Sequence, residues 1–209
     1  MNKWDKILHE EWYSQEKPDE IVIDFASLLT KKKKMRVLDL GCGGGRHQVY
    51  MARQGFVAHG IDFSETGLNL TKERLKKQKL EVNLAKCDMK MLPYINAYFD
   101  AVMSLHTIYH QKTVGIQKAI SEIHRILKRN GFLLMNFLSK RTYSYGKGTK
   151  VEKDTFVEQE GIERGVLHHF TDREEIERLL GNFKIINLKL REKEVEGKLR
   201  SRWIVIARK

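Results

Sequence analysis

The feature that most constrains this chain is a short apolar stretch that runs directly into a glycine-rich turn, at residues 37–45. An apolar run with a β-branched residue is typical of a strand buried on both faces, as in a parallel sheet. Gly41, Gly43 and Gly45 allow the backbone to turn tightly and to approach a ligand without an intervening Cβ. In an open α/β sheet, ligands bind beyond the carboxyl end of such a strand. The turn is therefore the first candidate for a ligand site.

Two classes of cofactor compete for this turn. A dinucleotide fold requires a G-x-G-x-x-G pattern, in which the third glycine allows close packing of helix and strand. Counting from Gly41 and Gly43, the third position is Arg46, which counts against a nicotinamide dehydrogenase. Asp62 nevertheless lies about where a ribose-binding acid is expected. A glycine-rich turn without any ligand is the remaining interpretation.

The rest of the chain alternates between strand and helix patterns. Pro18, Asp19 and Glu20 are expected to open a helix, and Ser64 to cap another. After the first strand we expect strands at 56–61, 82–86, 99–105 and 132–138, with the helix before the last one stopped by Asn130-Gly131. This alternation predicts an α/β fold with a doubly wound sheet.

The end of the chain departs from this rhythm. Residues 139–166 contain scattered glycines among mixed charges and are expected to form an irregular insertion on the substrate side. Thr171-x-x-Glu174 is a capping box that predicts another helix. The alternating runs 183–190 and 202–207 are expected to pair as an antiparallel hairpin at the edge of the sheet.

The acid and three alternating glycines, Asp39-x-Gly41-x-Gly43-x-Gly45, resemble motif I of the class I S-adenosylmethionine-dependent methyltransferases. The order of elements is similar to that family over nearly the whole chain. The resemblance implies a Rossmann-like methyltransferase fold, with a seven-stranded, mostly parallel sheet ending in an antiparallel hairpin. It also implies one methyltransferase domain over residues 1–209 and S-adenosyl-L-methionine as the cofactor.

The resemblance further implies which residues bind that cofactor. Asp62 would bind both ribose hydroxyls, because a carboxylate offers two acceptors to two adjacent donors. Phe63 would lie against the adenine, and Asp88 would accept from the adenine amino group unless it merely caps its own turn. Asp39 would take backbone donors or the amino end of the cofactor. The other expected cofactor contacts are Gly41, Cys42, Gly43, Gly45, Cys87, Met89, Ser104 and Leu105.

Candidate catalytic residues follow the fourth strand. His106 and His110 are placed to accept a proton from the methyl acceptor, although either could instead shape the substrate site or the fold. The family's Asn/Asp-Pro-Pro-Tyr signature is absent, since the chain reads Ser104-Leu105-His106-Thr107. This counts against methylation of adenine N6 or glutamine. His168-His169-Phe170 is expected to be structural.

Three large aromatic residues, Trp4, Trp12 and Tyr13, lie in the otherwise polar residues 1–17. We interpret this segment as a lid over the cofactor, with packing against the outside of the domain as the alternative. Two cysteines without a C-x-x-C pair give no metal-ligand spacing, and no metal is expected. With no apolar leader and no membrane-length run, the sequence predicts a reduced, cytoplasmic protein with no membrane partner.

The charge balance leaves the methyl acceptor open. The chain has 39 Lys and Arg against 27 Asp and Glu, a net charge of +12. Most of these cations fit the solvated faces and carboxyl ends of helices, so we favour a small-molecule acceptor. The alternatives are an RNA or protein methyltransferase that uses the basic surface, and a non-catalytic cofactor-binding protein. The sequence identifies neither the acceptor atom nor the oligomeric state.

Overall fold

The strand that precedes the glycine turn lies inside a ten-stranded sheet in the computed structural model, which describes residues 3–9, 16–33 and 35–209. The strands are β1 (Arg36–Leu40), β2 (Val57–Asp62), β3 (Asn83–Lys86), β4 (Phe99–Ser104), β5 (Leu127–Ser139), β6 (Thr149–Glu152), β7 (Thr155–Val157), β8 (Leu167–Thr171), β9 (Lys184–Val195) and β10 (Lys198–Arg208). The helices are α1 (Lys3–Ile7), α2 (Glu20–Lys31), α3 (Arg46–Arg53), α4 (Glu65–Lys77), α5 (Thr113–Ile126) and α6 (Arg173–Leu179).

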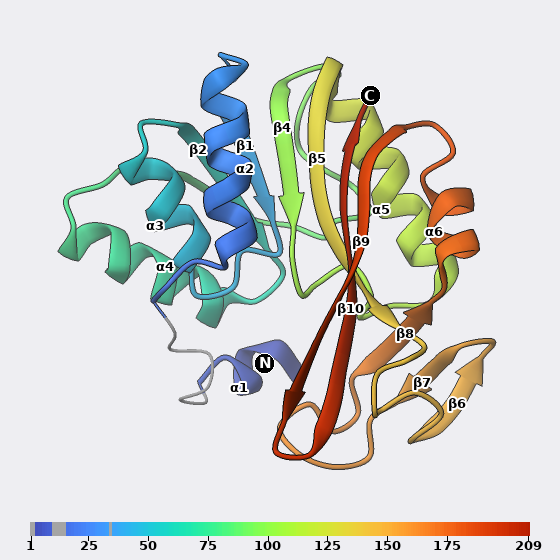
Figure 1. Ribbon diagram of the computed structural model, residues 1–209. Helices are drawn as coiled ribbons and strands as arrows, with labels where there is room; N and C mark the ends of the chain where they lie inside the picture. Colours follow the sequence, from blue (N-terminus) through green and yellow to red (C-terminus); the bar gives the residue numbers. More distant parts are fainter. Residues whose placement is uncertain (1–2, 10–15, 34) are drawn as a thin grey trace.

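The sheet confirms the expected fold class. Strands β3, β2, β1, β4 and β5 are parallel neighbours in that order, and β10 joins β5 antiparallel and carries β9 on its outer side. The ends of β1, β2 and β4 therefore point to one edge of the sheet. Figure 1 shows α1, the β9–β10 turn and strands β6 to β8 gathered beyond that edge. Segments from both ends of the chain and the β6 to β8 strands thus lie together at the carboxyl side of the central sheet.

Side-chain alternation divides the core into two layers. Leu38 of β1 and Val102 of β4 pack with the buried faces of α5 and α6. Their neighbours Val37 and Met103 pack instead against the apolar face of α2. Because both faces of the central strands are covered, these strands read as nearly continuous apolar runs. Among the described residues, none of the helices combines the length and the hydrophobicity needed to traverse a lipid bilayer.

The boundary between α5 and β5 differs from the prediction. The helix ends at Ile126, and β5 begins at Leu127, before the expected stop signal. Asn130 has a φ of 62°, and its N–H donates to the carbonyl of Lys209. The Asn130-Gly131 pair therefore belongs to β5, where it contacts the end of the chain. A left-handed Asn is as compatible with an irregular strand as with a helix end.

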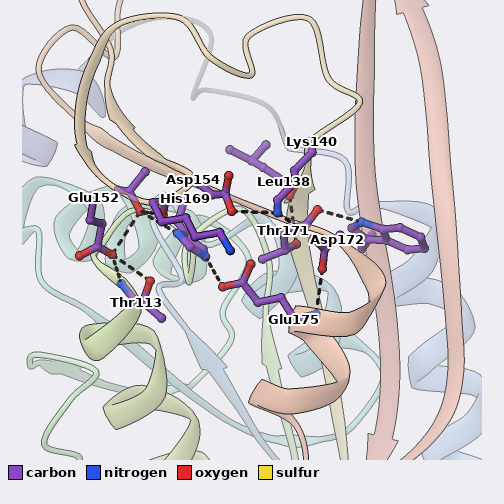
Figure 2. A network of polar contacts seen from close by, with 12 residues as sticks. Thr113, Leu138, Lys140, Glu152, Asp154, His169, Thr171, Asp172 and Glu175 are labelled. Carbon is purple, nitrogen blue, oxygen red and sulfur yellow. Dashed lines mark hydrogen bonds and ion pairs between the residues drawn. The ribbon is translucent and has the colours of Figure 1, made fainter.

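Residues 139–166 were expected to be irregular, but they contain β6 and β7, which extend the sheet from β8. Lys140 connects this segment to the start of α6, because its ammonium forms ion pairs with Asp154 at 2.8 Å and with Asp172 at 2.7 Å (Figure 2). Asp172, not Thr171, caps α6 by accepting from the N–H of Glu175. Thr171 is part of β8, and its hydroxyl donates to the Leu138 carbonyl. The capping box is thus wrong by one residue, because pairing with β5 holds Thr171 in the strand.

The short helix α1 is docked on the start of α4. The Asp5 carboxylate accepts from the Ser64 hydroxyl at 2.7 Å and from the Thr66 N–H at 3.2 Å. Ile7 and Leu8 are buried beside it. Ser64 also caps α4 as expected, because its hydroxyl accepts from the Gly67 N–H. Trp12 and Tyr13 lie outside the described residues, so the lid hypothesis rests on Trp4 and its neighbours in α1.

Asp19 joins the beginnings of α2 and α3. It occupies the N-cap position of α2, but its carboxylate contacts Arg46 at 3.1 Å and His47 at 3.7 Å. Burial alone would raise the pKa of Asp19, but its histidine and arginine partners outweigh burial and hold it below its usual range. Burial also lowers the pKa of His47 to about 3, with the Arg46 charge acting in the same direction.

A matched pair of glycine variants tests how tightly the turn is packed. Gly45 and Gly55 have φ values of +77° and +81°, so alanine should cost each about 1–2 kcal/mol of backbone strain. A Cβ at Gly45 would also lie 2.5 Å from Thr71, whereas no atom of the described residues lies within 4 Å of a Cβ at Gly55. In urea unfolding, Gly45→Ala should therefore lose clearly more stability than Gly55→Ala. Equal losses would contradict close packing of the turn against α4.

The buried His47 predicts a pH dependence of stability. Its pKa falls from 6.5 to about 3 on folding, so below pH 6.5 the unfolded chain binds a proton that the folded chain does not. The free energy of unfolding should therefore decrease as the pH is lowered. The contribution of His47 to this decrease is up to about 2.7 kcal/mol between about pH 6.5 and 4.5. His47→Asn should flatten this slope, whereas His9→Asn, at an exposed position, should not. Parallel curves for wild type and His47→Asn would show that folded His47 is already protonated.

Candidate cofactor and acceptor site

A cavity of about 630 Å³ lies at the carboxyl edge of the sheet. Its wall combines the glycine turn with residues that follow β2, β3 and β4, and with side chains from α1, β10 and the loop before β8. The wall residues used below are Trp4, Asp19, Gly41, Cys42, Gly43, Gly45, Arg46, Asp62, Phe63, Cys87, Asp88, Met89, Leu105, His106, Tyr109, His110, Glu163, Arg200 and Arg202. One cavity thus collects most of the residues that the sequence singled out.

The glycine turn forms one part of this wall, and protein atoms occupy the space beside two of its glycines. Gly41 has a φ of +80°, and a Cβ there would lie 2.3 Å from the Thr107 side chain. Gly45 is similarly blocked by Thr71. These two glycines are therefore required by the fold itself. Of the residues that the structure describes, a Cβ at Gly43 would meet only Leu8, at 3.7 Å.

Asp62 connects the end of β2 to the turn. Its Oδ2 accepts from the Gly43 N–H at 2.7 Å, and its Oδ1 accepts from the Ser64 N–H at 2.8 Å. Burial raises the pKa of Asp62, while the Ser64 and Gly43 hydrogen bonds oppose the rise. Each carboxylate oxygen has a second lone pair, so the side chain can still accept from two neighbouring hydroxyls. This arrangement fits a ribose.

The adenine-binding residues of the sequence prediction also reach the cavity. Phe63 lines it with 53% of its surface exposed, which leaves a large apolar ring for a planar partner. Asp88 lines it as well, but its Oδ1 accepts from the Lys90 N–H at 2.9 Å, as a turn-capping aspartate would. Its other oxygen pairs with the Lys90 ammonium at 3.0 Å. Both interpretations of Asp88 therefore keep structural support. Cys87 and Met89 lie beside it on the wall.

Two residues expected at the cofactor do not line the cavity formed by the described residues. Ser104 is fully buried, and its hydroxyl donates to the Leu40 carbonyl, which ties β4 to β1. Asp39 is also buried, and its Oδ2 has no hydrogen-bonding partner in the described part of the chain. Burial and the nearby Asp62 charge raise the pKa of Asp39 to about 8. By contrast, Cys42 and Leu105 are on the cavity wall.

His106 is held at both ring nitrogens. Its Nε2 lies 2.8 Å from Asp19 Oδ2, and its Nδ1 lies 3.2 Å from the Asn136 amide nitrogen. Asn136 Oδ1 accepts from the His106 N–H, so the amide nitrogen is the donor toward Nδ1. A neutral His106 therefore uses its one ring proton and its one lone pair within the protein. Burial lowers its pKa, although Asp19 opposes this.

His110 keeps one ring nitrogen for chemistry. Its Nδ1 lies 3.1 Å from the Leu167 carbonyl, which accepts the ring N–H and leaves the lone pair on Nε2. The ring lines the cavity and contacts Trp4, with ring centroids 4.7 Å apart. Burial lowers the pKa of His110 to about 4, so the imidazole is neutral at physiological pH. Of the two candidate histidines, His110 alone thus has a ring nitrogen without a hydrogen-bond partner among the described residues.

Several wall residues were missed in the sequence. The sequence pattern places Asp19 only at the opening of a helix and Glu163 only in an irregular insertion. No sequence motif points to Arg200 and Arg202, although a spacing of two residues on a strand places both side chains on one face. His169 is buried between Thr155 and Glu175, and both of its ring nitrogens have hydrogen-bonding partners there. Its neighbour His168 contacts Glu163 at 2.7 Å.

Comparison with known proteins agrees with this site. Residues 38–135 match the model of a family described as a methyltransferase domain. A ubiquinone biosynthesis O-methyltransferase of Pelagibacter ubique is 30% identical over 129 residues, which cover 61% of this chain and 52% of the relative. The chain therefore spans about half the length of this relative.

Two solved structures share the fold. An S-adenosylmethionine-dependent methyltransferase from Methanosarcina mazei superposes with a TM-score of 0.74 at 21% identity, covering 84% of this chain and 92% of its own. A 1,6-didemethyltoxoflavin N1-methyltransferase from Burkholderia thailandensis, solved with S-adenosylhomocysteine, gives 0.68 at 20% identity and covers 95% and 81%. Residues 38–135 therefore match a methyltransferase domain, and the chain has the fold of the class I S-adenosylmethionine-dependent methyltransferases that the motif around Gly41 resembles.

Proposed function

We propose that this protein methylates a small molecule, using S-adenosyl-L-methionine. The observation that carries the proposal is the single cavity of about 630 Å³ that joins the cofactor motif to a second set of side chains. When bound, the cofactor supplies a methyl group already activated on a sulfonium. The task of the protein is then to bind, to align the acceptor and to exclude water.

The cofactor end of the cavity contains the turn, Asp62 and Phe63. Asp62 is the group for the ribose hydroxyls, because the Gly43 and Ser64 N–H groups fix the orientation of its carboxylate toward the cavity. Phe63 is the apolar surface for the adenine. Asp39 lies buried behind the turn, where its Oδ2 has no partner among the described residues and could be satisfied by a water. These residues fit the cofactor that the family uses.

The acceptor end contains Trp4, Tyr109, His110 and Arg202. These side chains come from α1, from the segment after β4 and from β10, so an acceptor must be small enough to enter between them. His110 is the residue that meets the reacting group, because its Nε2 keeps a lone pair. His106 is a positioning residue, since Asp19 and Asn136 occupy both of its nitrogens.

The segment at residues 1–17 acts in this proposal as a lid. Trp4 lines the cavity, while Asp5 and Ile7 hold α1 on the protein through buried contacts. An aromatic ring on a docked helix provides apolar area that excludes water from the acceptor. Two similar proteins, the ubiquinone biosynthesis O-methyltransferase and the 1,6-didemethyltoxoflavin N1-methyltransferase, are named for small-molecule acceptors, which supports this proposal.

Cofactor identity is tested by thermal unfolding. S-adenosylhomocysteine at one hundred times its dissociation constant should stabilise the protein by about 2.7 kcal/mol, or roughly 5–10 °C. NAD should produce no shift, because Arg46 replaces the third glycine of a dinucleotide turn. Methyl transfer from radiolabelled cofactor should then appear with pooled small metabolites and not with RNA. Stabilisation by NAD alone would refute the proposal, and transfer only to RNA would refute the small-molecule acceptor.

The role of Asp62 is tested by Asp62→Asn, which keeps the size of the side chain and removes one acceptor oxygen and the charge. The loss of a charged hydrogen-bond acceptor should weaken S-adenosylhomocysteine binding by about 1.5–3 kcal/mol, which is roughly 10- to 150-fold. Isothermal titration calorimetry measures this loss. Asp24→Asn, on the exposed face of α2, is the matched control and should bind like the wild type. Unchanged affinity in a folded Asp62→Asn protein would remove this residue from the cofactor site.

A further inference from the structure

Three side chains at the acceptor end form a cluster that the sequence does not reveal. His110 follows β4, Glu163 belongs to the loop between β7 and β8, and His168 lies on β8. One nitrogen of each histidine and one carboxylate oxygen of Glu163 lie within 4.8 Å of one another. The closest pair is His168 Nε2 and Glu163 Oε2, at 2.7 Å. All three residues are at least partly buried.

The surroundings of both histidines resemble those of metal-binding imidazoles, which usually donate their second ring N–H to a carbonyl or a carboxylate. The Leu167 carbonyl already accepts from His110 Nδ1, at 3.1 Å, and this leaves Nε2 as the coordinating atom. His168 Nδ1 lies 3.9 Å from Glu158 Oε2. When Nε2 of His168 coordinates an ion, its ring proton resides on Nδ1 and faces this carboxylate. His110 therefore has its outer hydrogen-bond partner in place, and His168 has a carboxylate nearby that a small side-chain movement brings within reach.

We propose that His110, Glu163 and His168 bind a divalent transition-metal ion, of which zinc is the best match. Two imidazoles and one carboxylate are a ligand set used in catalytic zinc sites, with the fourth position left for water or substrate. Ligands about 2.0 Å from a tetrahedral ion lie about 3.3 Å apart, so the present cluster needs only small side-chain adjustments. Glu163 is in a loop and provides this freedom.

The fourth position would face the methyl acceptor, because His110 and Glu163 both line the cavity. This part of the inference rests on the proposed function. A metal there favours an acceptor with an oxygen donor such as a hydroxyl, since a bound divalent ion lowers the pKa of an oxygen ligand. His110 would then act on the acceptor through the ion and not as a free base. Glu158 and Glu163 supply the local negative charge for a cation in a chain of net charge +12.

The experiment measures metal binding directly. Tag-free protein is stripped with a chelator and titrated with Co²⁺, whose visible absorption reports the ligand geometry, and the ion is then displaced with Zn²⁺. We expect one ion per chain. Glu163→Gln and His168→Gln should each weaken binding by at least about 100-fold, because the loss of even an outer partner commonly costs 10- to 100-fold. Glu158→Gln should weaken it less, by about 10-fold.

Two variants provide matched controls. Glu160→Gln makes the same charge change in the same loop, and His124→Gln removes a histidine from α5 away from the cluster. Both should bind Co²⁺ like the wild type. Circular dichroism verifies folding, and Glu163→Gln alone decides the result if His168→Gln does not fold.

Three results would overturn the metal site: no stoichiometric ion, wild-type affinity in folded Glu163→Gln, or thiolate charge-transfer absorption that assigns the ion to Cys42 or Cys87. Binding of S-adenosylhomocysteine in the presence of chelator is measured in parallel. Cofactor binding and methyl transfer without a metal ion would refute only this inference. Metal binding without cofactor binding would refute only the proposed function.

Discussion

The hydrogen bond between Asp62 and the Gly43 N–H, 2.7 Å long, holds the site together. The parallel register pairs Leu40 with Ile61, so β1 and β2 end side by side and the acid reaches the turn directly. Thr71 of α4 completes the attachment by donating to the Gly43 carbonyl at 2.8 Å. The turn is thereby fixed to the next strand and to the next helix. The same carboxylate thus shapes the cavity and remains available to a ligand.

This double attachment changes how the glycines are understood. The conventional reason for a glycine in such a turn is that a ligand needs close access to the backbone. Here, Thr107 and Thr71 occupy the space beside Gly41 and Gly45. The turn is therefore constrained first by contacts within the protein. Because the turn is already rigid, its backbone loses little conformational entropy when a ligand binds.

The histidines differ because their hydrogen-bonding partners differ. His106 and His169 each have partners at both ring nitrogens, which fixes their orientation and uses their chemistry inside the fold. His110 has a described hydrogen bond at one nitrogen only, and it lies beside His168 and Glu163. An imidazole can serve as a base, a ligand or a scaffold, and the number of lone pairs left to it decides which.

The sequence by itself determined the fold class, and it placed the residues of the proposed cofactor end at one edge of the sheet. Strand and helix periods are local, and a motif such as Asp39 to Gly45 occupies consecutive residues, so both can be recognised without a structure. Asp62, Phe63 and Asp88 could be placed because each lies at or just after the end of a parallel strand, and such strands end at one edge. The helix cap at Ser64 was predictable for the same local reason.

Only the tertiary structure decided which side chains meet at the proposed acceptor end. The cavity brings together side chains from four distant elements. These are Trp4 of α1, His110 of the loop after β4, Glu163 of the loop before β8 and Arg202 of the last strand. No local period records such a meeting, because it depends on strand order and on the extra strands β6 to β8. The same limit explains why Ser104 faces Leu40 and not the cavity, and why Thr171 joins a strand. Pairing between distant segments outweighed the local signal in both cases, since a buried polar group must find its partner wherever the fold supplies one.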